Sequence, residues 1–270
     1  MKNGHHNKLF IALLCGALIW IVNLPRSQAQ SMMDFIDLES DQMTKAELSR
    51  AEVIQTLTAA RKDSPANFSS LALNGLDLSG LDFSGVNFRA ANLNKANFEG
   101  ANLTGAILDQ AWLLKANFKN ANLTKANIFQ AQMLDANLEN ANLSHARLAA
   151  NLTRANLTNA NLQQANLSAD MKNQSMGLIT GNLSSANCEG ADFSNANLSR
   201  AKLEFANLKN AKFIGTNLEK AELGGATLED TDITNANFKD ADLDSAKLIN
   251  LKGVGTSNLK DAKNTPPFNK

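Results

Sequence analysis

The chain has 270 residues, and its 26 Lys and Arg balance 26 Asp and Glu, so the formal net charge is zero. This balance disfavours a broad basic surface for nucleic acid, and equally a strongly acidic surface that would imitate DNA. Ala, Asn and Leu dominate, Tyr is absent and aromatic residues make up 6%. Such a bias indicates internal repetition before it indicates any particular chemistry.

The first 29 residues are typical of a secretory signal. Lys2 and Lys8 precede an apolar run, Leu9 to Val22, which is shorter than the roughly 20 residues of a membrane span. Ala29 closes a small-residue cleavage site, so we expect residues 1–29 to be removed and the mature chain to begin at Gln30. Export would then lead to the periplasm, or to the thylakoid lumen in a photosynthetic source, with no membrane attachment after cleavage. The alternative is that the apolar segment is retained as an anchor.

Residues 30–65 form a non-repetitive N-terminal segment. Thr44 and Glu47 match a capping box, in which both side chains satisfy free N–H groups at a helix start. Apolar residues then recur every three residues, at Leu48, Ala51, Ile54, Leu57 and Ala60. The spacing predicts a helix over residues 44–61 that ends before Pro65.

From residue 66 to residue 250 the sequence repeats every five residues as Ala-Asn-Leu-x-x. The large apolar residue of each unit, its centre, is apolar in all 36 units, which run from Phe68 to Leu148, from Leu152 to Leu167 and from Leu178 to Leu248. A period of five fits neither an α-helix nor a plain strand. In an extended segment, residues two apart point the same way, so each unit directs its centre and its Ala inward and three residues outward. Stacked coils of such units enclose a thin apolar interior.

These Ala-Asn-Leu-x-x units resemble the pentapeptide-repeat family, whose consensus is Ala-Asp/Asn-Leu-x-x. The resemblance implies an all-β fold, a right-handed quadrilateral β-helix with four units in each coil, and therefore about nine coils here. We expect the helix at residues 44–61 to cap the first coil against Leu71, Leu76 and Leu81, which replace the usual Ala. Residues 251–270 would form the C-terminal coil end and a tail.

Two irregularities interrupt the repeat. Leu148 and Leu152 are one residue too close, and Leu167 and Leu178 are one residue too far apart. The stretch from Ser168 to Ser175 also lacks the consensus. It is either a tolerated surface insertion or a recognition loop.

Catalytic groups are scarce. Without the signal, the chain has one histidine, His145, in an outward position, and one cysteine, Cys188, at a centre, where a buried thiol would be inert. Asp240, Asp242 and Asp244 occupy ordinary solvent positions. The sequence therefore predicts neither an enzyme nor a metal or cofactor site.

Large apolar residues at outward positions are the informative exceptions. Five of them fall within a short stretch, namely Ile107, Trp112, Leu114, Phe129 and Leu134. We call these five the apolar patch. A cluster of this kind usually marks a contact surface, and the alternative is that Phe35, Ile36 and Leu38 fold back to cover it.

The sequence favours an exported, non-enzymatic scaffold that binds an unidentified protein, or a second copy of itself, through the apolar patch or a solenoid end. We expect neither nucleic acid nor a cofactor as a partner. Two alternatives remain open: a secreted effector, and a DNA-mimicking protein that binds gyrase, which the family resemblance allows. The predicted signal and the balanced charge argue against the second.

Overall fold

The computed structural model describes residues 37–61, 63–171 and 179–268. The predicted signal at residues 1–29, Phe35, Ile36 and the predicted centre Leu178 lie outside these ranges. The chain divides into two compact units, Met1–Ser40 and Asp41–Lys270. In the first, the described residues form a turn in which the Ser40 N–H donates to the Asp37 carbonyl at 3.2 Å.

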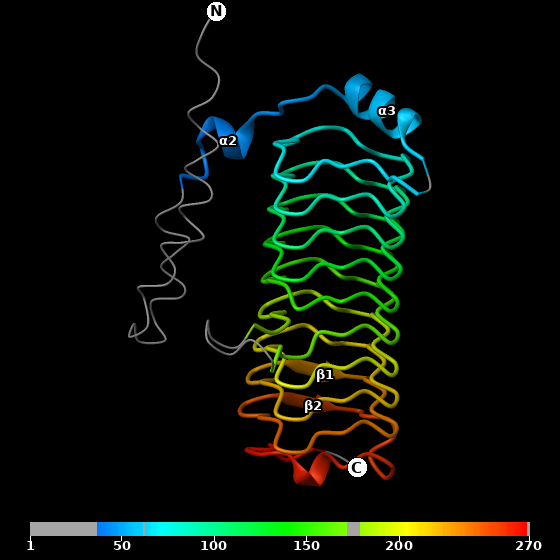
Figure 1. Cartoon of the computed structure of the whole chain (residues 1–270). Coiled ribbons are helices and arrows are strands. Elements are labelled where there is room, and N and C mark those ends of the chain that lie inside the picture. The colour runs from blue at the N-terminus through cyan, green and yellow to red at the C-terminus, as the bar shows by residue number, and fades with distance from the viewer. Residues whose placement is uncertain (1–36, 62, 172–178, 269–270) are drawn as a thin grey trace, which may run out of the picture. The chain divides into compact units, whose positions relative to one another are not determined.

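The second unit is a solenoid of stacked coils (Figure 1). Parallel β-bridges join residues twenty positions apart, as in Asn97 to Asn117 and Asn117 to Asn137, so four five-residue units complete one coil. We number the four sides by their first centres: side 1 begins at Phe68, side 2 at Leu73, side 3 at Leu78 and side 4 at Phe83. Because a turn follows each centre, most sides contribute only one bridging residue. Two stretches are long enough to be assigned as strands within the described ranges, β1 (Thr227–Glu229) and β2 (Lys247–Ile249), which pair in parallel.

Each corner is closed by the residue two positions after the centre. This residue has a positive φ, for example 58° at Lys95 and 60° at Lys125. The next residue then donates its N–H to the carbonyl of the centre, as Ala96 does to Leu93 at 3.1 Å. The chain turns at each corner because the third residue of this turn takes the left-handed conformation. The corners recur every five residues because the repeat does.

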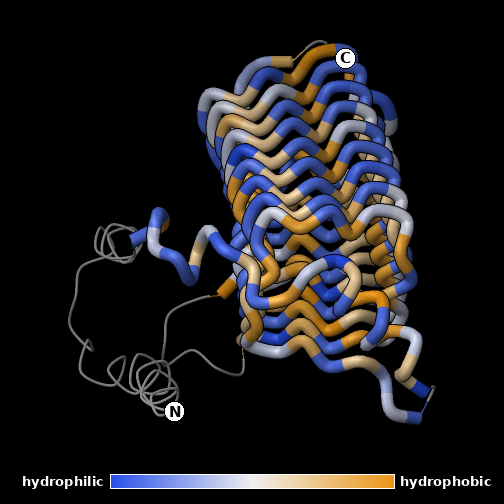
Figure 2. The backbone as a smooth tube through the Cα atoms, turned by 90° about the horizontal axis from the view of Figure 1, so that it is seen from above, coloured by the Kyte–Doolittle hydropathy of each residue, from blue (hydrophilic) through white to orange (hydrophobic). Residues whose placement is uncertain are grey.

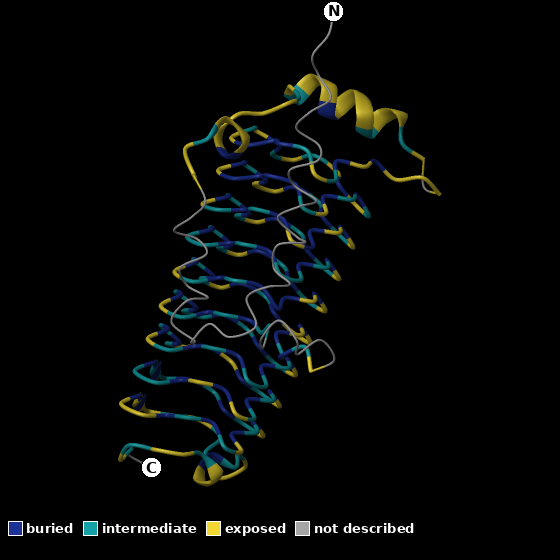
Figure 3. Ribbon diagram, turned by 60° about the vertical axis from the view of Figure 1, so that its left-hand side comes forward, coloured by how far each residue is buried: buried dark blue, intermediate teal, exposed yellow. Residues whose placement is uncertain are grey.

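The interior is apolar. Hydrophobic and hydrophilic residues alternate along the tube (Figure 2), and buried and more exposed residues alternate around the coils (Figure 3). The described centres are buried, and so are the Ala residues two positions before most of them. Where Phe occupies consecutive centres of one side the rings stack, with centroids 5.0 Å apart for Phe98 and Phe118 and for Phe193 and Phe213. Burial of these side chains stabilises the coils by about 1.5–3 kcal/mol each before the entropy cost.

Asn residues that follow one another at the position before the centre link neighbouring coils. On side 3, the Asn117 amide donates to Asn97 Oδ1 at 2.8 Å, and the Asn137 amide donates to Asn117 Oδ1 at 3.1 Å. The same oxygens accept a hydrogen bond within their own turn, for example from the Lys119 N–H to Asn117 Oδ1 at 3.1 Å. Asn is therefore selected here because its amide caps a turn and also binds the next coil.

The N-terminal helix begins later than the sequence predicts. A short helix, α2 (Asp41–Thr44), comes first, and α3 spans Arg50–Ala59. The capping box is formed by Ser49 and Glu52, so the predicted box at Thr44 and Glu47 is wrong. The buried face shifts accordingly, because Val53 is fully buried whereas Ile54 is 39% exposed. Of the predicted apolar positions, Leu48, Leu57 and Ala60 pack against the core.

Residues between α2 and α3 contact the first coil directly. Ala46 forms an antiparallel bridge with Leu73, and the Glu47 N–H donates to the Ala72 carbonyl at 2.6 Å. At the start of α3, the Arg50 guanidinium donates to the carbonyls of Asp77 and Ser79. Residues 46–50 therefore cover the N-terminal edge of the solenoid on sides 2 and 3.

The ladder continues beyond residue 250 at the C-terminal end. Lys263 bridges to Asp242, and the short 3-10 helix η5 (Leu259–Asp261) buries Leu259. The side chain of Asn258 accepts a hydrogen bond from the Phe238 N–H at 2.6 Å. Among the described residues, the helices are too short and too polar to cross a bilayer.

Candidate functional site

Both irregularities of the repeat lie at the corner between sides 1 and 2, in consecutive coils. In the first of these coils, Leu148 and Leu152 are joined by a tight turn in which the Ala150 N–H donates to the Leu148 carbonyl at 2.8 Å. The bridge register on side 2 therefore shortens, with Asn151 paired to Gln132. This corner has lost one residue and is flatter than its neighbours.

The next coil carries an insertion at the same corner. Side 1 ends at Leu167, and side 2 resumes at Leu183, because Asn182 bridges to Asn151. The two ends of the insertion meet, since the Asp170 N–H donates to the Ile179 carbonyl and the Gly181 N–H donates to the Leu167 carbonyl, each at 2.9 Å. A Cβ at Gly181 would lie 2.9 Å from the Cβ of Leu167, so only glycine fits this closure.

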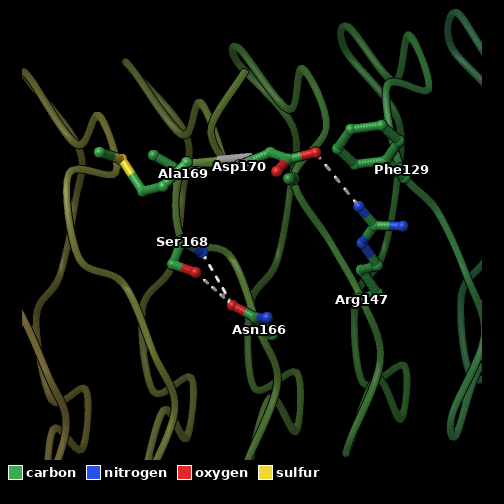
Figure 4. A pocket seen from close by; sticks show the side chains of 8 residues that line it. Phe129, Arg147, Asn166, Ser168, Ala169 and Asp170 are labelled. Carbon is green, nitrogen blue, oxygen red and sulfur yellow. Dashed lines mark hydrogen bonds and ion pairs between the residues drawn. The ribbon is translucent and has the colours of Figure 1, made fainter. Parts of the chain in front are cut away.

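The insertion and the shortened corner enclose a pocket of about 330 Å³, which we call the corner pocket (Figure 4). The Arg147 guanidinium lies over the Phe129 ring, 3.8 Å from its centroid, and its Nη2 is 3.7 Å from Asp170 Oδ2. Asn166 holds the start of the insertion by accepting hydrogen bonds from the Ser168 N–H and hydroxyl at 3.1 and 2.7 Å. The lining residues are Phe129, Arg147, Ala149, Asn166, Ser168, Ala169, Asp170 and Met171.

Arg147 also interrupts the Asn ladder of side 1. It occupies an Asn position, as Ile107 does two coils earlier, and Asn127 lies between them. Asn127 Oδ1 is buried without a hydrogen-bond partner among the described residues. A buried acceptor without a donor costs free energy, so this part of the surface is not optimised for the stability of the solenoid alone.

Asp109 lies directly beside Phe129 on side 1. Burial raises the pKa of its carboxyl, while the Phe129 N–H and the positive charges of Arg89 and Arg147 act in the opposite direction. Its Oδ2 lies 3.7 Å from Arg89 Nη2, and its Oδ1 has no hydrogen-bond partner among the described residues. Asp109 is therefore a buried carboxyl with one unpaired oxygen among the described residues, next to Phe129.

The structure divides the apolar patch between two adjacent sides. Trp112, Leu114 and Leu134 lie on side 2, where Leu114 and Leu134 occupy equivalent positions of consecutive coils. Ile107 and Phe129 lie on side 1, and Phe129 also lines the corner pocket. Ile107 is 37% exposed, and the other four side chains are half-buried. The patch and the corner pocket therefore form one continuous surface across the corner.

Other candidate groups do not assemble into a site. His145 is exposed, and Asp240 forms an ion pair with Lys263 at 3.2 Å. Cys188 is fully buried, and burial raises the pKa of its thiol to about 12. The described residues contain no group of three His, Cys, Asp or Glu side chains that could hold a metal ion.

Sequence reasoning missed Arg147 and Asp170 as members of this surface. Arg147 had a readable signal, because it replaces the ladder Asn of its unit, as Ile107 and Trp112 do. Asp170 had none, since its position depends on how the insertion folds back. Elsewhere in the described ranges, Phe205 is the most exposed large apolar residue, at 72%, and its ring lies over Gly225 of the next coil, away from side 1.

The comparisons agree with the geometry of a repeat solenoid. A family model for pentapeptide repeats matches eight copies within residues 66–169, 182–213 and 211–250, which is more than half of the chain. The chain belongs to the pentapeptide-repeat family, as its Ala-Asn-Leu-x-x units predicted. No curated protein matches the chain.

Several solved structures are similar to the chain. HetL, a pentapeptide repeat protein involved in heterocyst differentiation regulation from the cyanobacterium Nostoc sp. strain PCC 7120, is 28% identical, with a TM-score of 0.34 over 80% of this chain and 97% of that chain. QnrB1, a plasmid-mediated fluoroquinolone resistance protein, is 21% identical, with a TM-score of 0.41 over 75% and 84%. A pentapeptide repeat protein from the Arabidopsis thaliana thylakoid lumen is 30% identical, with a TM-score of 0.23 over 49% and 65%.

Proposed function

We propose that the chain is an exported, non-enzymatic scaffold that binds a partner protein through the apolar patch. In this proposal the repeats form a right-handed quadrilateral rod of about nine coils, and α3 caps its first coil. The rigid ladder of coils fixes the outward side chains relative to one another, so that the surface is preorganised before it binds.

The observation that carries the proposal is the concentration of unusual features at one corner. The same two sides hold the apolar patch, the shortened turn, the insertion and the corner pocket. Trp and Arg, the residue types enriched among those that dominate interface energy, both occur here as Trp112 and Arg147. The partner we expect is a protein that presents an apolar side chain to side 2 and a carboxylate to Arg147.

The double variant Trp112→Ala with Leu114→Ser tests the contact surface. Both side chains are half-buried and neither is a centre, so we expect the solenoid to fold and the partner to be lost. The matched control is Thr124→Ala with Ser144→Ala, since these residues lie on side 4, opposite side 2. Retention of every interaction of the parent protein at unchanged stability would refute the proposal. A large loss of stability would mean that the patch is an internal contact.

Export is tested separately by N-terminal sequencing of the protein from its producing organism. The motivation is the charged start and apolar run of residues 2–22, and we expect the mature chain to begin at Gln30. An intact Met1 in a cytosolic fraction would contradict export and would favour the gyrase-binding alternative.

A further inference from the structure

The first coil directs main-chain groups outward along the solenoid axis. Between coils on side 1, the Asn87 N–H donates to the Ala66 carbonyl, and the Asn87 carbonyl accepts from the Phe68 N–H. The residue before each centre therefore pairs with the preceding coil through its own N–H and C=O. Within the described ranges no coil precedes the first one, and the four residues whose N–H and C=O occupy this position are Asn67, Ala72, Asp77 and Asp82.

Two of these four positions are satisfied by the N-terminal segment. On side 2, the Glu47 N–H donates to the Ala72 carbonyl at 2.6 Å, and the Ala72 N–H donates to Glu47 Oε1 at 3.3 Å. On side 3, the Arg50 guanidinium donates to the carbonyls of Asp77 and Ser79. The segment that precedes the repeats thus covers half of the open end.

The other two positions have no such partner among the described residues. Asn67 on side 1 and Asp82 on side 4 are exposed, and neither main-chain N–H nor C=O has a hydrogen-bond partner within the described ranges. The Asp82 side chain is already engaged, because its Oδ1 accepts from the Ser84 N–H at 3.0 Å and from the Asn102 amide at 2.9 Å. An unpaired edge of this kind is a template for another extended chain.

A groove runs beside the open edge of side 4. It has a volume of about 580 Å³ and lies between the end of α3, with Leu57 and Ala60, and the corner where side 4 of the first coil passes into the second coil, with Asp82 and Val86. Arg61 and Asp82 bring one positive and one negative charge to the groove, and most of the other lining residues are apolar. An extended segment bonded to Asp82 would direct alternate side chains into this groove.

We propose that side 4 of the first coil binds an extended peptide segment of a partner protein by β-strand addition, with an apolar side chain of the peptide in the groove beside Leu57 and Val86. The antiparallel bridge of Ala46 to Leu73 shows that the same coil already accepts an extended chain on side 2. Main-chain hydrogen bonds supply affinity in this mode, and the groove supplies selectivity.

A second copy of the rod does not fit this edge. Residues 46–50 lie across the first coil on sides 2 and 3, and the end of α3 lies beside side 4, so that a flat coil cannot stack on this end. The other end of the solenoid is also covered, on side 1 by Asn258 and on side 2 by Lys263. In the proposal, a slender peptide lies in the groove between α3 and side 4 and leaves both segments in place. This site is separate from the apolar patch and does not depend on it.

The test uses a display library of random heptapeptides selected on the full protein purified from its producing organism. We expect enriched peptides to carry Val, Ile or Leu at alternate positions. Asp82→Pro removes the open N–H without breaking a hydrogen bond of that N–H, and we expect it to weaken binding of an enriched peptide at least roughly tenfold. Asp82→Ala is the matched control, because it loses the same carboxylate but keeps the N–H, and should bind about as well as the parent protein.

Amide hydrogen exchange provides a readout that does not depend on the proline variant folding. We expect the main-chain N–H of Asp82 to exchange rapidly in the free protein and to become protected from exchange when an enriched peptide is bound. The main-chain N–H of Asn102, which already donates to the Leu81 carbonyl at 3.0 Å, should be protected from exchange in both states. Three results would each overturn the proposal: failure to enrich any peptide, equal binding to Asp82→Pro and Asp82→Ala, or an Asp82 amide that is already protected in the free chain. A Trp112→Ala, Leu114→Ser variant that still binds the peptide would separate this site from the proposed partner surface.

Discussion

Arg147 stacks on Phe129 from the next coil of side 1, with its guanidinium carbon 3.8 Å from the ring centroid. Phe129 belongs to the apolar patch, and Arg147 pairs with Asp170 of the insertion. The Arg147 side chain therefore links the apolar patch, which the sequence predicts, to the insertion, whose role the sequence leaves open.

Replacing Arg147 by Ala should lower the free energy of unfolding by about 0.5–1 kcal/mol, because the cation–π contact is partly exposed. Arg147→Lys keeps the charge but loses the planar stack, so we expect an intermediate value. Urea unfolding of the three proteins measures the effect. If Arg147→Ala were as stable as the parent protein, the stack would not hold the insertion in place.

Replacing Leu123 by Asp should break the solenoid. Leu123 is a fully buried centre on side 4, and an unpaired carboxylate there lacks any compensating partner. We expect a loss of at least about 3 kcal/mol. Lys125→Glu, two residues away at an exposed corner, is the matched control and should change stability by less than about 0.5 kcal/mol. Circular dichroism during denaturation compares them, and the opposite order of the two effects would disprove the inward register.

Asp109→Asn should stabilise the protein at neutral pH. Burial raises the pKa of Asp109 in the folded state above its unfolded value, so the folded protein holds this proton more tightly. The contribution of this carboxyl to stability is therefore most favourable below the unfolded pKa and is lost as the pH rises through the folded pKa. The advantage of the Asn variant should be present at pH 7 and disappear toward pH 4. A variant that is less stable at pH 7 would show that the ion pair with Arg89 outweighs burial.

Cys188 should not react with a thiol reagent in the folded protein. It is fully buried, and burial raises its pKa to about 12, so almost no thiolate is present at neutral pH. Labelling should begin only at denaturant concentrations that open the coils. Rapid labelling in native buffer would mean that the middle of the solenoid opens locally.

The interior of the solenoid was predictable because one chemical rule repeats many times. Every described centre had to be apolar, and Leu123 and Cys188 are both buried as the register predicts. The double role of the Asn amides was not predictable from polarity alone. The second role depends on the spacing between coils. Asn117 shows both roles, because its oxygen accepts from the N–H of Lys119 in its own turn and its amide donates to Asn97 of the preceding coil.

The irregular parts were predicted less well. The helix start was misplaced because Thr44 and Ser49 each begin a capping pattern, and only contact with the first coil selects Ser49. The start of the insertion after Leu167 was predicted correctly, but the point at which the repeat ladder resumes was not. The ladder passes from Leu167 directly to Leu183, whereas the sequence pattern counted Leu178 as a centre.

The most direct test of the proposed partner surface is site-specific photo-cross-linking in the producing organism. A photoreactive residue at position 134 would replace a half-buried Leu of the apolar patch on side 2, and the same residue at position 144 would replace Ser144 on the opposite side 4. The proposal predicts a cross-link to one defined protein from position 134, its absence from position 144, and its loss when Trp112→Ala is added. Equal cross-linking from both positions, or none from position 134, would contradict it.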